Sequence, residues 1–190
     1  VLLNAIMSVA QIIVVTGLIF ILYNYLLRAI GIELLGIWSL MLATTSVTQI
    51  ANFGLSGSVV KFVAKYIMRK EDKNVSDVIQ TATLSSGIFV AVISLISYPI
   101  VTWALNLIIP DEYLSYALDI LPFALLSLFI MTITSIFQAG LDGYQRFDLR
   151  SLILMGATLL YLILCFIFVP KYGLKGVAYA QVIQGVILLL

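Results

Sequence analysis

Charged residues are absent from long stretches of this sequence, and these stretches constrain the fold more than any other feature. Uncharged runs extend over residues 1–27, 34–60, 78–110, 120–141 and 151–170, and a further run begins at Gly176. A helix needs about 20 predominantly apolar residues to cross the hydrocarbon core of a bilayer. Every complete run can hold one such helix, so we expect an all-α integral membrane protein with about six transmembrane helices.

The expected spans form an up-and-down bundle. They cover about residues 4–27, 34–53, 77–106, 115–140, 150–169 and 174–190. Hydrophobic residues make up 63% of the chain and charged residues 10%, a balance that no water-soluble domain of this size could bury. The connections over residues 28–34 and 170–176 are so short that they join antiparallel neighbours. Because the chain opens on Val1 rather than Met and stops at Leu190 in an apolar run, we expect it to be one part of a longer protein.

The composition argues against an enzyme. The chain has no histidine, which removes the commonest acid–base group and metal ligand, and its single cysteine, Cys165, lies in an apolar run. A membrane enzyme would need clustered acids or histidines on a substantial loop, and the connecting loops here are short. We therefore predict no catalytic residues, no metal ligands and no cofactor. A net charge of +1 also argues against nucleic acid as a partner.

Lysine and arginine are unequally divided between the two sides of the expected bundle. The connections after the second and fourth spans carry seven of these residues, and the other connections carry three. The seven are Lys61, Lys65, Arg69, Lys70, Lys73, Arg146 and Arg150, and the three are Arg28, Lys171 and Lys175. Because cytoplasmic loops are enriched in Lys and Arg, we expect a multi-pass protein of the cell membrane (plasma or inner membrane) with a cytoplasmic N-terminus.

Polar residues recur at helical spacing in two of the spans, so that each set shares one helix face. The set in the second span is Thr45, Gln49, Asn52 and Ser56, and the set in the fourth is Ser127, Thr134 and Gln138. Such stripes are typical of helices that line a common hydrated cavity, and equally of hydrogen bonds across a tightly packed helix interface. The second span fits both readings, whereas packing is favoured for the fourth.

Two cationic features are candidates for contact with an anionic ligand. Arg28 lies where the first span meets the outer interface, and its planar guanidinium suits a pyrophosphate; the alternatives are extension to lipid headgroups and pairing with Glu33. Residues 57–73 are expected to form a basic amphipathic helix, because Lys61 and Lys65 begin a series of cations that recur every four residues. This helix is expected to lie on the cytoplasmic surface against anionic lipids. The alternative is a cationic vestibule that collects a phosphorylated lipid substrate.

Four segments resemble those of a known family of membrane proteins. The segments LLRAIGIELLGIWSL (residues 26–40) and ANFGLSGSVVKFVAKYIMRKED (51–72) are similar to the first two spans and following connection of polysaccharide flippases. The segments QAGLDGYQRFDLRS (138–151) and VPKYGLKGVAYAQVI (169–183) are similar to later connections of that family. These flippases belong to the multidrug/oligosaccharidyl-lipid/polysaccharide exporter superfamily, and the resemblance extends over most of the chain in the right order.

The resemblance implies a fold of two six-helix lobes around a central cavity, in which residues 1–190 correspond to the N-terminal lobe and the C-terminal lobe is absent. It also implies alternating access, with an undecaprenyl-pyrophosphate-linked oligosaccharide moved from the cytoplasmic to the outer leaflet for polysaccharide biosynthesis. Membrane lipids and the C-terminal lobe are the other implied partners. We predict that Arg28, Gln49, Asn52 and Lys61 bind this substrate, the cations at the pyrophosphate and the amides at the sugars.

Asn52 departs from the family pattern and leaves other functions open. In NFGLS it stands where many members have an acidic residue, and an amide cannot take up and release a proton. The alternative function is a multidrug/ion antiporter of the same superfamily, which we would expect to carry an ionisable residue in mid-span. A membrane-embedded enzyme of the same pathway and a non-transporting structural subunit are the remaining alternatives.

Overall fold

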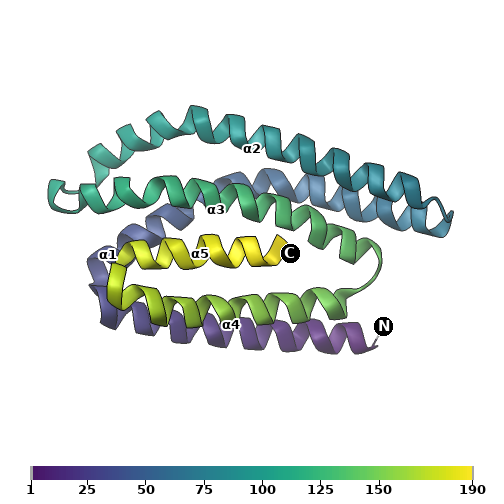
Figure 1. Cartoon of the computed structure of the whole chain (residues 1–190), viewed down its shortest axis with the longest axis horizontal. Coiled ribbons are helices and arrows are strands. Elements are labelled where there is room, and N and C mark those ends of the chain that lie inside the picture. Colours follow the sequence, from purple (N-terminus) through teal and green to yellow (C-terminus); the bar gives the residue numbers. More distant parts are fainter. Residues whose placement is uncertain (1, 190) are drawn as a thin grey trace.

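The structure is a computed structural model that describes the backbone of residues 2–189 and the side chains of these residues except 2, 3, 5 and 44–55. The helices are α1 (Leu2–Met68), α2 (Asp72–Ile108), α3 (Asp111–Gly143), α4 (Phe147–Tyr172) and α5 (Leu174–Leu189). They lie roughly parallel or antiparallel to one another in a single bundle (Figure 1), and the described residues contain no strand. The prediction of an all-α bundle is therefore confirmed.

α1 consists of two antiparallel segments that meet at Gly31. Its backbone there has φ 84° and ψ 171°, a conformation that is essentially restricted to glycine. The first segment runs from the N-terminus to one end of the bundle, and the second returns along the other side (Figure 1). The break lies within the short connection expected at residues 28–34, and it divides the helices of the chain into six segments, the number expected.

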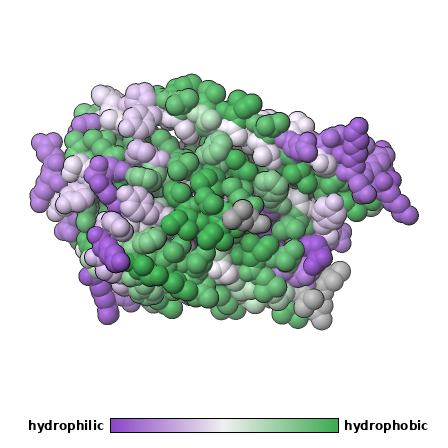
Figure 2. All heavy atoms as spheres, in the orientation of Figure 1, coloured by the Kyte–Doolittle hydropathy of each residue, from purple (hydrophilic) through white to green (hydrophobic). Residues whose placement is uncertain are grey.

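The middle of the bundle has the surface of a protein in a membrane. Within the described residues, four helical stretches are long and apolar enough to cross a bilayer: Ile6–Ala43, Asp72–Ile108, Asp111–Gly143 and Phe147–Tyr172. Apolar side chains cover the middle of the molecule and hydrophilic ones gather at its two ends (Figure 2). Exposed isoleucine, leucine and phenylalanine side chains face outward from the helices, as lipid contact requires. This arrangement confirms an integral membrane fold.

α3 is the central helix of the bundle. Half of its most apolar window is buried, compared with 11% of the corresponding window of α2. α5 lies directly against it, because a Cβ atom on Gly185 would be only 2.8 Å from Ile130 Cγ2. Small residues permit such close approach between helices in a membrane. This contact determines how near the polar side chains of α5 come to those of α3.

The structure differs from the separate amphipathic helix expected over residues 57–73. α1 continues without a break to Met68, and α2 begins at Asp72. The apolar face of this segment packs on protein, since Val59 and Val63 are buried in a cluster with Val75, Ile136 and Ala139. Those contacts hold the segment upright against α2 and α3. It therefore cannot lie flat on the membrane surface.

The second segment of α1 and α2 form a hairpin that is longer than a bilayer is thick. The 37 residues of α2 extend for about 55 Å, whereas the hydrocarbon core is about 30 Å thick. The hairpin projects beyond the other helices at the end of the bundle where the α3–α4 loop and the N-terminus also lie (Figure 1). We call this the basic end, because the connections at residues 69–71 and 144–146 lie there with the seven expected cations. Its cytoplasmic location stays a prediction.

Candidate functional site

A polar cavity lies between α1, α3, α4 and α5 in the middle of the bundle. Its volume is about 330 Å³. The polar lining residues are Ser56, Thr132, Thr134, Ser135, Gln138, Gln181 and Gln184, and the apolar ones are Leu128, Met131, Leu154 and Leu188. Polar groups that converge among apolar side chains are characteristic of sites that bind organic molecules.

Helical spacing explains why these side chains meet. On α3, Leu128, Thr132, Ser135 and Gln138 recur at intervals of four, three and three residues, so they project from one face. On α5, the glutamines are three residues apart and share a face in the same way. The close contact at Gly185 brings this face of α5 near to α3. Two helix faces of similar polarity therefore border the same space.

The hydroxyl groups of the cavity act mainly as acceptors toward a ligand. Thr132 Oγ1 donates to the carbonyl oxygen of Leu128 at 2.9 Å, and Ser135 Oγ donates to that of Thr132 at 2.7 Å. Thr134 Oγ1 donates to the carbonyl oxygen of Ile130 at 3.0 Å. These bonds engage the hydroxyl protons within α3, so the oxygens of Thr134 and Ser135 can act as acceptors.

The three glutamines supply the donors. Within the described part of the chain, the side-chain amides of Gln138, Gln181 and Gln184 have no hydrogen-bond partner. Each amide can donate two hydrogen bonds and accept two. None of the described lining residues is ionisable. The cavity therefore matches a neutral hydrogen-bonding group better than an isolated charge.

The cavity brings together members of both predicted polar stripes. Ser56 from the second span and Thr134 and Gln138 from the fourth line the same space, which agrees with the reading in which the stripes share a cavity. Ser127 behaves differently. It is buried, and its hydroxyl donates to the carbonyl oxygen of Ala124 at 2.8 Å, which agrees with the packing reading at that position.

The four predicted substrate-binding residues do not form one cluster among the described side chains. Gln49 and Asn52 belong to α1, but their side chains lie outside the described residues. Arg28 is exposed in a shallow hollow of about 280 Å³ beside Asn24 and Tyr25, and it forms no ion pair with Glu33 or any other described residue. Lys61 is exposed on the hairpin.

Arg28 and Lys61 lie at opposite ends of the molecule. The 30 residues of continuous helix from Ile32 to Lys61 extend for about 44 Å. Neither cation lines the polar cavity. One compact substrate headgroup in that cavity cannot contact both of them.

Sequence reasoning did not identify Thr132, Ser135, Gln181 and Gln184 as lining residues. The two glutamines in the Q-V-I-Q segment, Gln181 and Gln184, stand in an otherwise apolar run with no charge after Lys175. Amides in such a run are the same signal as the stripes in the second and fourth spans. That signal marks α5 as a candidate, but only the packing of α5 on α3 shows that these amides face the cavity.

An apolar helical bundle around a polar cavity, with no ionisable residue among the described lining residues, defines an all-α integral membrane protein. The MatE family model matches residues 7–167, and the chain belongs to the MatE family. Members of this family are transporters rather than enzymes. A search of curated proteins found no match.

Three solved transporters have the same fold. One is an outward-facing multidrug resistance MATE family transporter of the MOP superfamily, with a TM-score of 0.79, 18% identity and 97% of this chain covered. A second is a MOP superfamily transporter from Pyrococcus furiosus Vc1, for which reverse polarity of the binding pocket suggests a different function; its TM-score is 0.80, with 18% identity and 98% of this chain covered. The third is a MATE protein in complex with Br-NRF, with a TM-score of 0.78, 19% identity and 99% of this chain covered.

The match extends over only part of each relative. The chain spans 42% of the first two structures and 43% of the third, so it corresponds in fold to one lobe. The family model shows membership of the MatE family, and the three structures show the shared fold. The narrower assignment to polysaccharide flippases is not supported, since the comparisons are closer to the multidrug alternative.

Proposed function

We propose that the chain forms one lobe of a two-lobe transporter that exports an amphipathic organic solute by alternating access. The observation that carries this proposal is the polar cavity framed by α3 and α5, whose described lining residues carry no charge, in a chain of the MatE family. A second lobe would close the cavity on its remaining side, and rocking of the lobes would expose it to each face of the membrane in turn. The location is the cell membrane, with the basic end in the cytoplasm.

The cavity explains how a solute of this kind is held. Leu128, Met131 and Leu188 offer apolar contact, while the free amides of Gln181 and Gln184 offer hydrogen bonds. A solute with an apolar body and a few polar atoms satisfies both kinds of group. The absence of charge among the described lining residues favours release, because no strong ion pair has to be broken before the solute leaves.

A lipid-linked oligosaccharide is the second candidate substrate. The observation that favours it is the chemistry of the lining, since the amide and hydroxyl groups of Gln138, Gln181 and Ser56 are suited to sugar hydroxyls. In this proposal Gln49 and Asn52 extend the sugar contacts. Arg28 and Lys61 act on the pyrophosphate in sequence, one at each end of the path, because they lie too far apart to act together.

Transport by the full-length protein in vesicles distinguishes the two substrates. We expect ethidium, an amphipathic solute, to be expelled, and we expect the double substitution Gln181→Leu and Gln184→Leu to slow its export about tenfold through two lost hydrogen bonds. Gln80→Leu is the matched control, because Gln80 is exposed on α2 and bonds only to Ser76 at 3.2 Å. Movement of a lipid-linked oligosaccharide without ethidium export would establish the second candidate. If neither compound moves, or if the control variant loses as much activity as the double variant, the proposal fails.

A further inference from the structure

A second groove, separate from the polar cavity, lies between α1 and α2 on the projecting hairpin. Its volume is about 340 Å³. The α1 wall consists of Ser58, Val59, Phe62 and Tyr66, and the α2 wall consists of Asn74, Asp77, Val78, Thr81, Ala82 and Ser85. We infer that this headgroup groove binds a phospholipid with a primary-amine headgroup, phosphatidylethanolamine, from the membrane leaflet at the basic end.

An acidic residue lines one side of the groove, and a basic residue lies beside the aromatic rings that line the other side. On the α1 side, Lys65 Nζ lies 5.6 Å from the ring centre of Tyr66 and 6.0 Å from that of Phe62. On the α2 side, Asp77 is exposed and makes no ion pair or hydrogen bond with a described residue. Lys65 and Asp77 do not pair with each other across the groove. A zwitterionic headgroup satisfies both charges, with its phosphate toward Lys65 and its ammonium toward Asp77.

The α2 wall is rich in hydrogen-bond acceptors. Asn74 donates through Nδ2 to Glu71 Oε2 at 2.7 Å, so its carbonyl oxygen is left to accept. Ser85 Oγ donates to the carbonyl oxygen of Ala82 at 3.2 Å, so the hydroxyl oxygen is also left to accept a hydrogen bond. With the carboxylate of Asp77, these atoms suit an ammonium that carries three N–H donors. The quaternary ammonium of phosphatidylcholine has no N–H to offer, so the wall favours ethanolamine over choline.

The level of the groove in the membrane also indicates a lipid. Tyr98 and Trp103 are exposed on α2 and fit the aromatic belt at the far interface. The hydrocarbon core needs about 20 helical residues, and counting back from Trp103 places its near boundary at about residue 83. Ala82 and Ser85 therefore lie at the edge of the core, and Asp77 lies in the headgroup layer. Exposed Leu84 and Ile88 continue into the core, where acyl chains would lie against them.

Native mass spectrometry of the full-length protein tests this inference. The probes are phosphatidylethanolamine, phosphatidylcholine and phosphatidylglycerol with identical acyl chains, each added to detergent-purified protein. We expect phosphatidylethanolamine to bind about tenfold more tightly than phosphatidylcholine, because only its ammonium donates charge-assisted hydrogen bonds. Asp77→Asn should remove this preference, and Lys65→Gln should weaken both lipids alike through their shared phosphate.

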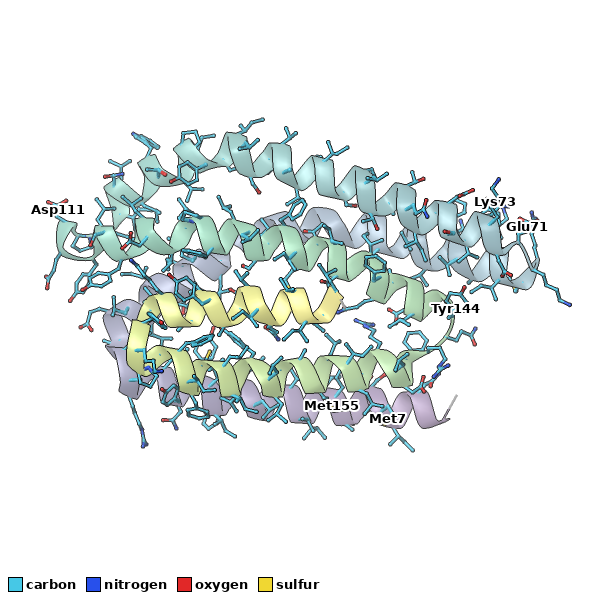
Figure 3. The ribbon with its side chains drawn as sticks, viewed as in Figure 1. Met7, Glu71, Lys73, Asp111, Tyr144 and Met155 are labelled. Atoms are coloured by element: carbon cyan, nitrogen blue, oxygen red, sulfur yellow. The ribbon has the colours of Figure 1, made fainter. Side chains whose placement is uncertain are left out.

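Asp111→Asn is the matched control, since it removes the same charge at the end of the bundle opposite Glu71 and Lys73 (Figure 3). It should leave the preference unchanged. Thermal unfolding checks that Asp77→Asn is folded, which we expect because the carboxylate makes no contact that the fold needs. Equal binding of the two lipids to the wild-type protein overturns the inference, and so does a preference that survives Asp77→Asn. Tetraphenylphosphonium binding that depends on Asp77, with no lipid preference, would instead identify the groove as a site for organic cations.

Discussion

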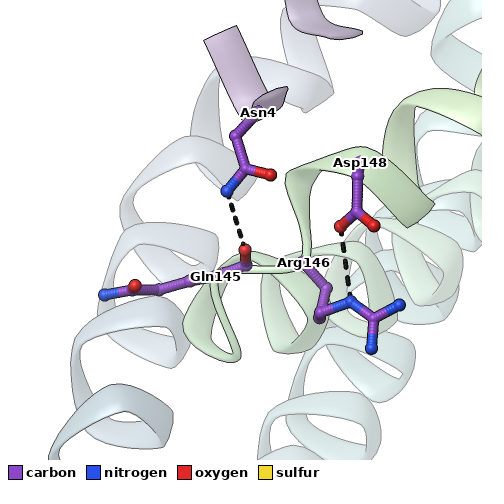
Figure 4. A network of polar contacts seen from close by, with 4 residues as sticks. All are labelled: Asn4, Gln145, Arg146 and Asp148. Carbon is purple, nitrogen blue, oxygen red and sulfur yellow. Dashed lines mark hydrogen bonds and ion pairs between the residues drawn. The ribbon is translucent and has the colours of Figure 1, made fainter. Parts of the chain in front are cut away.

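The hydroxyl of Ser151 donates a hydrogen bond of 2.8 Å to Gln11 Oε1, and this contact joins α4 to the first segment of α1. Ser151 is buried. At the basic end of the same helices, Asn4 donates to the carbonyl oxygen of Gln145 at 3.0 Å (Figure 4). Polar contacts between distant parts of the chain therefore fix the first segment of α1 in place.

Ser151→Ala should lower the free energy of unfolding by about 0.6–1.5 kcal/mol, because it leaves Gln11 without its partner between two helices. Unfolding in mixed micelles measures the change. Ser76→Ala is the control, since Ser76 is exposed on α2. Equal stability of Ser151→Ala and the wild-type protein would show that the contact contributes nothing.

Asp142→Asn should destabilise the protein by about 1–2 kcal/mol, because Asp142 Oδ2 accepts from Arg150 Nη1 at 2.8 Å and its side chain is only 15% exposed. The substitution leaves the arginine charge without its partner. Asp148→Asn is the comparison, since Asp148 pairs at 3.3 Å with Arg146, whose side chain is 58% exposed (Figure 4). Exposed pairs contribute little, so this variant should unfold like the wild-type protein. Similar losses for both substitutions would contradict the difference in burial.

Gly185→Ala should separate α5 from α3, because its Cβ would lie 2.8 Å from Ile130 Cγ2. Overpacking of this kind costs about 1–3 kcal/mol, and it should also reduce transport by displacing Gln181 and Gln184. Adding Ile130→Ala to this variant removes the clashing atom, so it should restore part of the lost stability and part of the lost transport. Gly156→Ala is the control, since no atom lies within 4 Å of its Cβ position. If Ile130→Ala does not rescue Gly185→Ala, the loss does not come from the contact between these two residues.

Gly31→Ala should destabilise the protein by about 1–3 kcal/mol, because a Cβ is disfavoured at φ 84° and ψ 171°. Gly17→Ala provides the contrast, since Gly17 is helical and its Cβ position is open; alanine there should be neutral or stabilising. Thermal unfolding of the two variants measures the difference. A neutral Gly31→Ala would mean that the segments can join through another backbone conformation.

The sequence predicted an all-α membrane bundle of about six helices because charges are excluded from hydrocarbon. The break at Gly31 also followed from it, since Arg28 and Glu33 bracket a connection too short for anything but a reversal. The end of α1 was harder to predict. A change from apolar to basic residues marks the membrane boundary, but it does not end a helix, and the burial of Val59 and Val63 is a tertiary contact.

Helical spacing made part of the candidate site predictable from the sequence. The spacing of Thr134 and Gln138 places them on one face, and the structure puts Ser56 beside them. Gln181 and Gln184 are found only once α5 is packed on α3, because a single helix does not show which of its faces borders a cavity. The separation of Arg28 and Lys61 likewise depends on the continuous helix between them.

The long uncharged runs have an electrical consequence. Moving one elementary charge across a membrane potential of 100 mV is worth about 2.3 kcal/mol. Residues 34–60, 78–110, 120–141 and 151–170 contain no charged side chain, so rocking of this lobe would carry almost no protein charge through the field. In the proposed transporter, the potential would then act on this lobe mainly through the charge of the solute.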